Sequence, residues 1–212
     1  QEVLVRVRTH LSIAMLSRQL AERNGLLERK NAELEEEIAL RKLLKGQLTG
    51  VAEREAENWG LQNIVGRSAT IERLLHEVEE LQSHAGTPVL IQGESGVGKE
   101  LVARAVHYGG SRRDGPFVRV DCAQIPRDIV KSFEQRSQAL SLLFGHVRGA
   151  FEGADDDHDG YFRMAHGGTL YFDEIGCIPV ALQAALLRSL ESGEIRRIGE
   201  PDGIAVDVRI LV

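Results

Sequence analysis

The stretch that decides the fold comprises residues 87–100, which read Thr87-Pro88-Val89-Leu90-Ile91-Gln92-Gly93-Glu94-Ser95-Gly96-Val97-Gly98-Lys99-Glu100. Its apolar run, typical of a buried strand, stops at Gly93, and a helix-forming stretch begins at Lys99. The glycines let backbone N–H groups turn inward, the helix N-terminus adds partial positive charge, and the Lys99 ammonium can reach the outer phosphates of a nucleotide. A turn that binds nothing would share this outline, but the flanking strand, the helix and the lysine favour a phosphate-binding loop.

The predicted nucleotide ligands are the residues of this loop: Gly93, Glu94, Ser95, Gly96, Val97, Gly98, Lys99 and Glu100. The spacing matches the phosphate-loop pattern G-x-x-x-x-G-K, but Glu100 stands where most such loops place a Ser or Thr on magnesium. One protein ligand of Mg²⁺ must therefore come from elsewhere.

An acidic pair downstream is the candidate for that ligand. Residues 169–173 form an apolar run announced by two glycines, and this run ends in Asp173 followed by Glu174. Carboxylates at the C-terminal end of a buried strand can hold the metal and activate the attacking water. Asp173 is therefore the predicted metal residue, and Glu174 the predicted general base. An Asp-Glu pair can also simply cap a helix, but the preceding strand favours the catalytic interpretation.

The other predicted elements alternate between helix and strand. A helix capped by Ser68 carries Ile71, Leu74, Leu75, Val78 and Leu81 on one face. Further expected elements are a helix over 101–107, a strand over 117–121, a helical region over 126–143, a helix over 180–190 and a strand over 206–212. This alternation predicts an α/β fold with a mainly parallel sheet and the nucleotide at the C-terminal edge of the strands.

The N-terminal 60 residues follow a different pattern. A heptad from Ile13 places Leu20, Leu27 and Leu34 at d positions and Asn24 and Asn31 at a positions. Asparagine at a fixes register and dimeric state in a two-stranded parallel coil, so the pattern predicts a dimerising coiled coil. A solvated charged helix, or a helix packed on its own domain, stays an alternative. The pattern fades after Leu48, which places a domain boundary near residue 60.

Composition and charge limit the classes of protein to which the chain can belong. With 212 residues and a formal charge of -6, the chain has no general affinity for nucleic acid, and no apolar run approaches the length of a membrane span. Cys122 and Cys177 stand alone and no secretory leader precedes them, which indicates a cytoplasmic protein. Residues 155–160 mimic half of a calcium loop, but His166 stands where a Glu is required, which favours a solvated acidic turn. The start at Gln1 and the stop at Val212 inside an apolar run indicate a fragment.

With these motifs in view, residues 64–212 resemble the AAA+ P-loop NTPase domain of NtrC-type bacterial enhancer-binding proteins, which remodel the sigma-54 form of RNA polymerase. The matching phrases lie at 93–107, 144–146, 149–154, 160–175 and 193–199. In that family Glu is normal at the position of Glu100. Residues 4–11 resemble the last helix of a response-regulator receiver. The resemblance therefore implies a receiver end over 1–12, a coiled-coil linker over 13–60 and an incomplete AAA+ ATPase domain over 61–212.

The resemblance also implies a mechanism for a two-component, phosphorelay regulator. ATP would bind between subunits of a ring, usually a hexamer, and its hydrolysis would move the partner loop, Gly149, Ala150, Phe151, Glu152, Gly153 and Ala154, against sigma-54 holoenzyme. Phe151 would be the apolar contact, and Asp121 and Arg197 are the switch and interface candidates. The missing C-terminal part would supply the trans-acting arginines, the lid and a DNA-binding helix-turn-helix, so the fragment itself should hydrolyse ATP poorly.

Three features depart from the family pattern. Glu152 replaces the usual Thr in the partner loop, residues 134–139 lengthen the preceding segment, and Asp121 stands where Asn is common. Two acids as close as Asp121 and Glu174 would raise a pKa or need a bridging proton or water. Two alternatives stay open: a family member that has lost sigma-54 contact and serves as a nucleotide-sensing DNA-binding or oligomerisation module, and an inactive fragment.

Overall fold

The computed structural model describes residues 23–25, 29–31, 34–35, 54–55, 57–125 and 132–212. The chain divides into two compact units, residues 1–50 and residues 51–212. In the first unit the described residues are helical. The predicted receiver end lies outside the described residues, as does most of the predicted coiled coil, so dimerisation and the domain boundary at 60 stay predictions.

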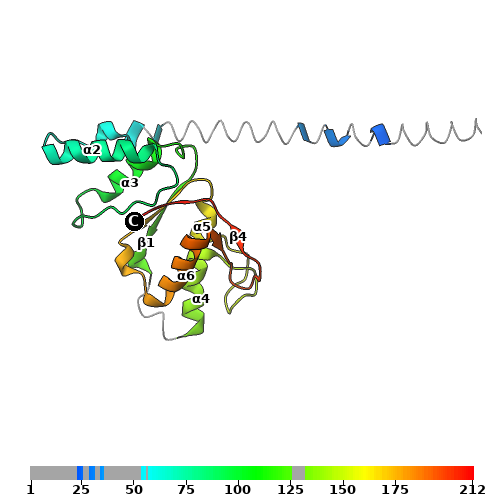
Figure 1. Ribbon diagram of the computed structural model, residues 1–212. Coiled ribbons are helices and arrows are strands. Elements are labelled where there is room, and N and C mark those ends of the chain that lie inside the picture. The colour runs from blue at the N-terminus through cyan, green and yellow to red at the C-terminus, as the bar shows by residue number, and fades with distance from the viewer. Residues whose placement is uncertain (1–22, 26–28, 32–33, 36–53, 56, 126–131) are drawn as a thin grey trace, which may run out of the picture. The chain divides into compact units, whose positions relative to one another are not determined.

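The second unit is built on a parallel sheet (Figure 1). Strands β1 (Phe117–Asp121), β2 (Thr169–Asp173) and β5 (Arg209–Leu211) lie in the order β1-β2-β5. β1 and β2 have the bounds that the sequence predicts, and Asp121 pairs with Asp173 at the C-terminal end of their register. The buried strand expected before the phosphate loop is not formed as such. Residues 89–91 lie along β5, where the Val89 amide donates to the Ile210 carbonyl at 3.1 Å, but Val89 makes only an isolated bridge to Leu211, and Leu90 is exposed. The expected alternating α/β fold with a parallel sheet is confirmed.

Helices cover both faces of this sheet. On one face lie α2 (Ala69–Gln82) and α3 (Lys99–Tyr108), and on the other lie α4 (Phe133–Phe144), α5 (Tyr161–Met164) and α6 (Val180–Ser192) (Figure 1). β2 is buried over its first four residues because both faces are covered. Its side chains therefore divide between two cores: Leu170 and Phe172 pack with α4, α5 and α6, whereas Tyr171 packs with α2 and α3.

Short elements connect these layers. They are the 3₁₀ turns η1 (Leu61–Asn63), η2 (Cys122–Gln124) and η4 (Ile175–Cys177), and an antiparallel pair of β3 (Glu194–Ile195) with β4 (Ile204–Ala205). The turns η2 and η4 directly follow β1 and β2, so they lie at the edge of the sheet where the strands end.

The structure corrects two predicted boundaries. The strand expected over 206–212 is shorter, because the Asp207 carbonyl accepts the Gly167 amide at 2.8 Å and the Asp207 amide donates to the His166 ring at 3.2 Å. The helical region expected over 126–143 begins at Phe133 with Ser132 as its cap, and residues 126–131 are outside the described part. The predicted cap of α2 is confirmed, since the Ser68 hydroxyl accepts the Ile71 amide at 3.3 Å.

The described residues contain neither a candidate membrane span nor a preformed cluster of metal ligands. No helix there combines the length and hydropathy that a bilayer span needs. No group of three or more His, Cys, Asp or Glu side chains there is arranged to hold a metal ion.

Candidate functional site

The phosphate loop joins the 89–91 run to the N-terminus of α3. Gly96 and Gly98 have positive φ angles of 82° and 96°, a region that glycine adopts without steric cost, and Gly98 is the N-cap of α3. A Cβ added at Gly93 would lie 2.9 Å from a methyl of Val97, so the loop leaves no room for a side chain there. The Lys99 ammonium donates to the carbonyls of Gly93, at 3.0 Å, and Glu94, at 2.9 Å. The lysine thus lies over its own loop.

Glu174 has the only positive φ angle among the described non-glycine residues, with φ 55° and ψ 51°. This left-handed conformation costs an ordinary residue roughly 1–2 kcal/mol, and such strain concentrates at functional sites. The turn is fixed by the Cys177 amide, which donates to the Glu174 carbonyl at 2.8 Å. The Cys177 thiol also lies 3.7 Å from the Glu174 carboxylate.

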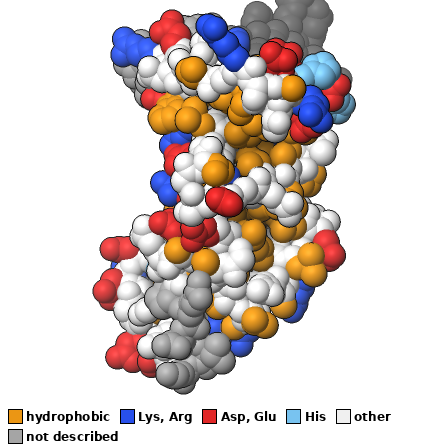
Figure 2. Space-filling model, turned by 90° about the vertical axis from the view of Figure 1, so that its left-hand side faces the viewer, with side chains coloured by type: hydrophobic (Ala, Val, Ile, Leu, Met, Phe, Trp, Pro, Cys, Tyr) orange, Lys and Arg blue, Asp and Glu red, His pale blue; other side chains and the backbone are white. Residues whose placement is uncertain are grey.

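The loop and Glu174 face one cavity of about 510 Å³. Its lining residues are Leu90, Ile91, Gln92, Gly93, Ser95, Lys99, Tyr171, Phe172, Glu174, Ile175, Gly176 and Val212. The structure therefore brings together the predicted phosphate loop and the predicted general base, whereas Asp173 and Glu100 are not among the lining residues. Figure 2 shows hydrophobic side chains gathered in a hollowed band across one face of the molecule, so apolar surface is open to a ligand or partner there.

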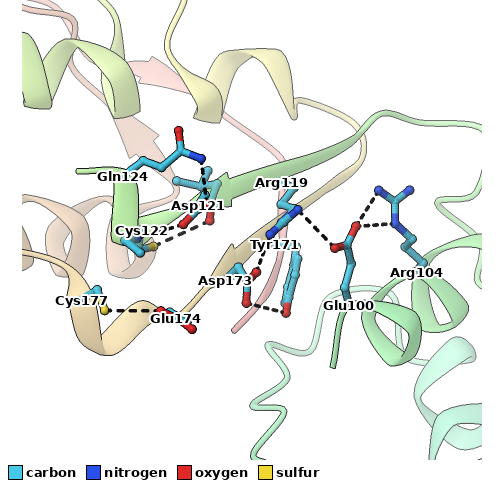
Figure 3. Close-up of polar contacts among 12 residues, drawn as sticks. Glu100, Arg104, Arg119, Asp121, Cys122, Gln124, Tyr171, Asp173, Glu174 and Cys177 are labelled. Atoms are coloured by element: carbon cyan, nitrogen blue, oxygen red, sulfur yellow. Dashed lines mark hydrogen bonds and ion pairs between the residues drawn. The ribbon is translucent and has the colours of Figure 1, made fainter. Parts of the chain in front are cut away.

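Asp173 is held by two partners from its own chain (Figure 3). Its Oδ2 accepts from the Arg119 guanidinium at 2.7 Å, and its Oδ1 accepts from the Tyr171 hydroxyl at 3.2 Å. The hydrogen bond to Asp173 raises the pKa of Arg119. Burial, together with the Asp173 charge, raises the pKa of Tyr171 to about 12, so this hydroxyl stays a donor at neutral pH.

Glu100 lies in the same network of charges. Its Oε2 is 3.3 Å from Arg119, and its Oε1 accepts from Arg104 at 2.8 and 2.9 Å. Arg104 in turn lies over the Trp59 ring at 4.5 Å and over the Phe117 ring at 4.9 Å. Neither Arg119 nor Arg104 was among the site residues predicted from the sequence. A signal existed for Arg119, because Val118 and Val120 beside it point to the opposite face of the sheet, which turns Arg119 toward α3.

These donors fit a magnesium nucleotide. Mg²⁺ prefers oxygen ligands and is commonly held by one or two carboxylates plus substrate phosphates, so it does not need a site of three protein carboxylates. Asp173 and Glu100 offer carboxylate oxygens beside a glycine loop, a helix N-terminus and Lys99, which suit phosphates.

The predicted partner loop is a tight glycine-flanked turn. Gly149 and Gly153 have positive φ angles of 78° and 90°, and the Gly149 amide donates to the Ala154 carbonyl at 2.8 Å. The Phe151 ring packs edge-on against the His146 ring, with centroids 4.9 Å apart, whereas Glu152 is exposed. Next to the loop, the Asp157 carboxylate accepts the Arg148 amide at 2.8 Å.

The two switch and interface candidates have local partners. The Asp121 carboxylate accepts the Ala123 amide at 3.0 Å and the Gln124 amide group at 2.8 Å, and among the described residues it shares no hydrogen bond with Glu174. Arg197 donates to Glu200 at 2.6 Å and lies 3.9 Å from Asp157, so it is placed beside the partner loop. Neither residue lines the nucleotide cavity.

Comparisons with known proteins agree with this geometry. The model of the sigma-54 interaction domain family matches residues 64–212. The Nif-specific regulatory protein of Herbaspirillum seropedicae is 43% identical over 151 residues, which cover 71% of this chain and 26% of that protein. The anaerobic nitric oxide reductase transcription regulator NorR of Aeromonas salmonicida is 41% identical over 180 residues, which cover 85% of this chain and 33% of that protein.

Solved structures agree as well. The crystal structure of NtrX from Brucella abortus in complex with ATP superposes with a TM-score of 0.58 at 34% identity, covering 70% of this chain and 29% of that one. The chain thus spans about a third or less of the length of the curated relatives that it matches.

Proposed function

The chain belongs to the sigma-54 interaction domain family, and from that premise we propose that it binds and hydrolyses ATP to drive transcription by sigma-54 RNA polymerase holoenzyme. The observation that carries the proposal is the cavity shared by the phosphate loop and Glu174. Relatives named as transcription regulators and a neighbour solved with ATP support it.

In this proposal the phosphate loop, Glu174 and Asp173 each have one task; Asp173 ends β2 next to Glu174 but is not among the residues that line the cavity. The loop amides and Lys99 bind the phosphates, and Lys99 leaves the Gly93 and Glu94 carbonyls to do so. Asp173 holds the Mg²⁺, which supplies positive charge at the transferred phosphate when bound. Glu174 accepts a proton from the attacking water, and its strained backbone fixes the carboxylate at the end of β2.

Binding and chemistry are separable by mutation. Lys99→Ala should abolish ATP binding in calorimetry on this chain, whereas Glu174→Gln should keep ATP binding and, in the complete protein, lose phosphate release. Lys30→Ala, an exposed lysine in the first structural unit, is the matched control. Retained ATP affinity in Lys99→Ala would remove the phosphate-loop assignment.

The partner loop is the proposed contact with sigma-54. A two-state loop can do work on a partner only if each state binds that partner differently, and Phe151 packed on His146 is the state seen here. The exposed charge of Glu152 favours a second candidate, a family member without sigma-54 contact that acts as a nucleotide-sensing oligomerisation or DNA-binding module. Binding of sigma-54 by the parent with a transition-state nucleotide analogue would exclude that candidate, and binding only after Glu152→Thr would support it.

The remaining parts of the proposal concern the complete protein. We propose a two-component response regulator with a receiver, a dimerising coiled coil over 13–60, an ATPase ring and a DNA-binding domain, located in the cytoplasm. Sedimentation of residues 10–48 tests the coil: a strictly monomeric peptide would contradict it.

A further inference from the structure

Arg119 joins Asp173, the proposed metal residue, to Glu100 in the first turn of α3. It lies on β1 directly across from Tyr171 on β2, and its guanidinium reaches Asp173 at 2.7 Å and Glu100 at 3.3 Å (Figure 3). The three residues come from β1, β2 and the first turn of α3. The guanidinium therefore ties the N-terminus of the nucleotide helix to the end of the strand that carries the acidic pair.

Charge explains why a cation is needed at this point. Asp173 and Glu100 lie on opposite sides of one guanidinium, and two carboxylates around one site repel each other unless a positive group lies between them. Both oxygens of Asp173 are already engaged, Oδ2 by Arg119 and Oδ1 by Tyr171. A metal ion, bound directly or through water, must share or displace one of these donors.

We propose that Arg119 is a positioning residue of the nucleotide site: without nucleotide its guanidinium supplies the positive charge that holds Asp173 and Glu100, and it gives up Asp173 to a divalent cation. This inference rests on the proposed ATP-binding function. It assigns Arg119 as a competitor of Mg²⁺, so the residue sets how strongly ATP binding depends on the metal.

The network also provides a probe far from the phosphates. Glu100 is shared between Arg119 and Arg104, and Arg104 stacks on Trp59, the only tryptophan in the chain. The Trp59 indole donates to Glu55 at 2.8 Å, and Glu55 lies 3.9 Å from Arg104. When Arg119 leaves Asp173, the charge around Glu100 and Arg104 changes, and the indole emission reports it.

The test compares ATP affinity in Mg²⁺ with ATP affinity in EDTA, by calorimetry on the 212-residue chain. Removing Arg119 takes away a competitor of the metal and also leaves two carboxylates uncompensated near metal-free ATP. Arg119→Gln should therefore raise the ratio of the EDTA to the Mg²⁺ dissociation constant by roughly tenfold, the worth of about 1.4 kcal/mol. Arg119→Lys, whose ammonium faces one carboxylate at a time, should give an intermediate ratio.

Control variants distinguish competition of Arg119 with Mg²⁺ from a purely structural role of the residue. Arg113→Gln, which changes an exposed arginine 4.0 Å from Asp114, should keep the parent ratio. Adding Mg²⁺ to the ATP-bound parent should shift Trp59 emission, and Arg119→Gln should lose that shift. If Arg119→Gln does not fold, as judged by circular dichroism, Arg119→Lys decides the question.

Three outcomes would overturn the inference. An Arg119→Gln ratio within twofold of the parent, with both dissociation constants also unchanged, would mean that Arg119 does not compete with the metal. Equal weakening in Mg²⁺ and EDTA would make Arg119 a phosphate contact instead. In both cases the parent still binds ATP, so the proposed function stands, whereas a parent that does not bind ATP overturns both.

Discussion

The left-handed backbone of Glu174 allows its strain to be measured separately from its carboxylate. Glu174→Gly and Glu174→Ala both remove the carboxylate, but only the alanine keeps a Cβ at φ 55°. The left-handed conformation costs a residue with a Cβ roughly 1–2 kcal/mol, a cost that glycine avoids. The greater conformational freedom of glycine in the unfolded chain takes back about 0.4–1 kcal/mol of that advantage. The glycine variant should therefore be about 1 kcal/mol more stable than the alanine variant, or about 2–4 °C in Tm.

A regular helix gives the control of opposite sign. Glu77 is exposed in the middle of α2, where Glu77→Gly should be less stable than Glu77→Ala by about 1 kcal/mol. Urea unfolding followed by circular dichroism measures all four variants. If Glu174→Gly is as stable as Glu174→Ala or less stable, the backbone of Glu174 is not strained and the argument that links its conformation to catalysis fails.

Three further predictions follow from buried or capping side chains. Burial lowers the pKa of His107 to about 4, whereas the imidazole of the unfolded chain takes up a proton near its ordinary pKa of about 6.5. The contribution of the neutral, buried His107 to the free energy of unfolding is therefore full above pH 6.5 and falls as the pH drops toward 4. The free energy of unfolding should thus lose about 2 kcal/mol between pH 7.5 and 5 through this group, and His107→Asn should flatten that part of the urea-unfolding profile; an unchanged slope would contradict the burial argument. Leu182 is fully buried on α6, so Leu182→Ala should lower the free energy of unfolding in urea by about 2–5 kcal/mol. Leu187 is exposed on the same helix, so Leu187→Ala should lower it by less than about 0.5 kcal/mol. Equal losses in the two variants would contradict the assigned core. Ser68→Ala should lower Tm through about 1 kcal/mol of lost capping, and Ser68→Asp should restore it.

Strands β1 and β2 were predictable from the sequence, because each follows a glycine-containing turn and ends in an aspartate. Residues 117–121 and 169–173 are short apolar runs between turn signals, and the structure gives them these bounds. The strand at 206–212 was predicted too long, because its first residues follow the same apolar alternation while their backbone groups bond to His166 and Gly167, a tertiary contact that alternation does not reveal.

The candidate site was predictable only where a local sequence pattern marks it. A phosphate loop and an acidic pair can each be recognised by their own spacing, and the loop and Glu174 line one cavity. The contact of Asp173 with Arg119 has no such spacing, since the two residues meet only through the pairing of β1 with β2, whereas Tyr171 lies two residues before Asp173 on β2 itself. The partner loop was located from the family resemblance of residues 149–154, but the packing of Phe151 on His146 depends on a residue outside that loop.

The pairing of Val89 with Leu211 bears on how this domain forms in the cell. The phosphate loop leaves the ribosome well before the strand that it must lie against, and the cavity includes Val212 in its wall. Contacts between distant parts of a chain form late because their loop closure is entropically costly. A nascent chain should therefore acquire this nucleotide pocket only after β5 has been translated.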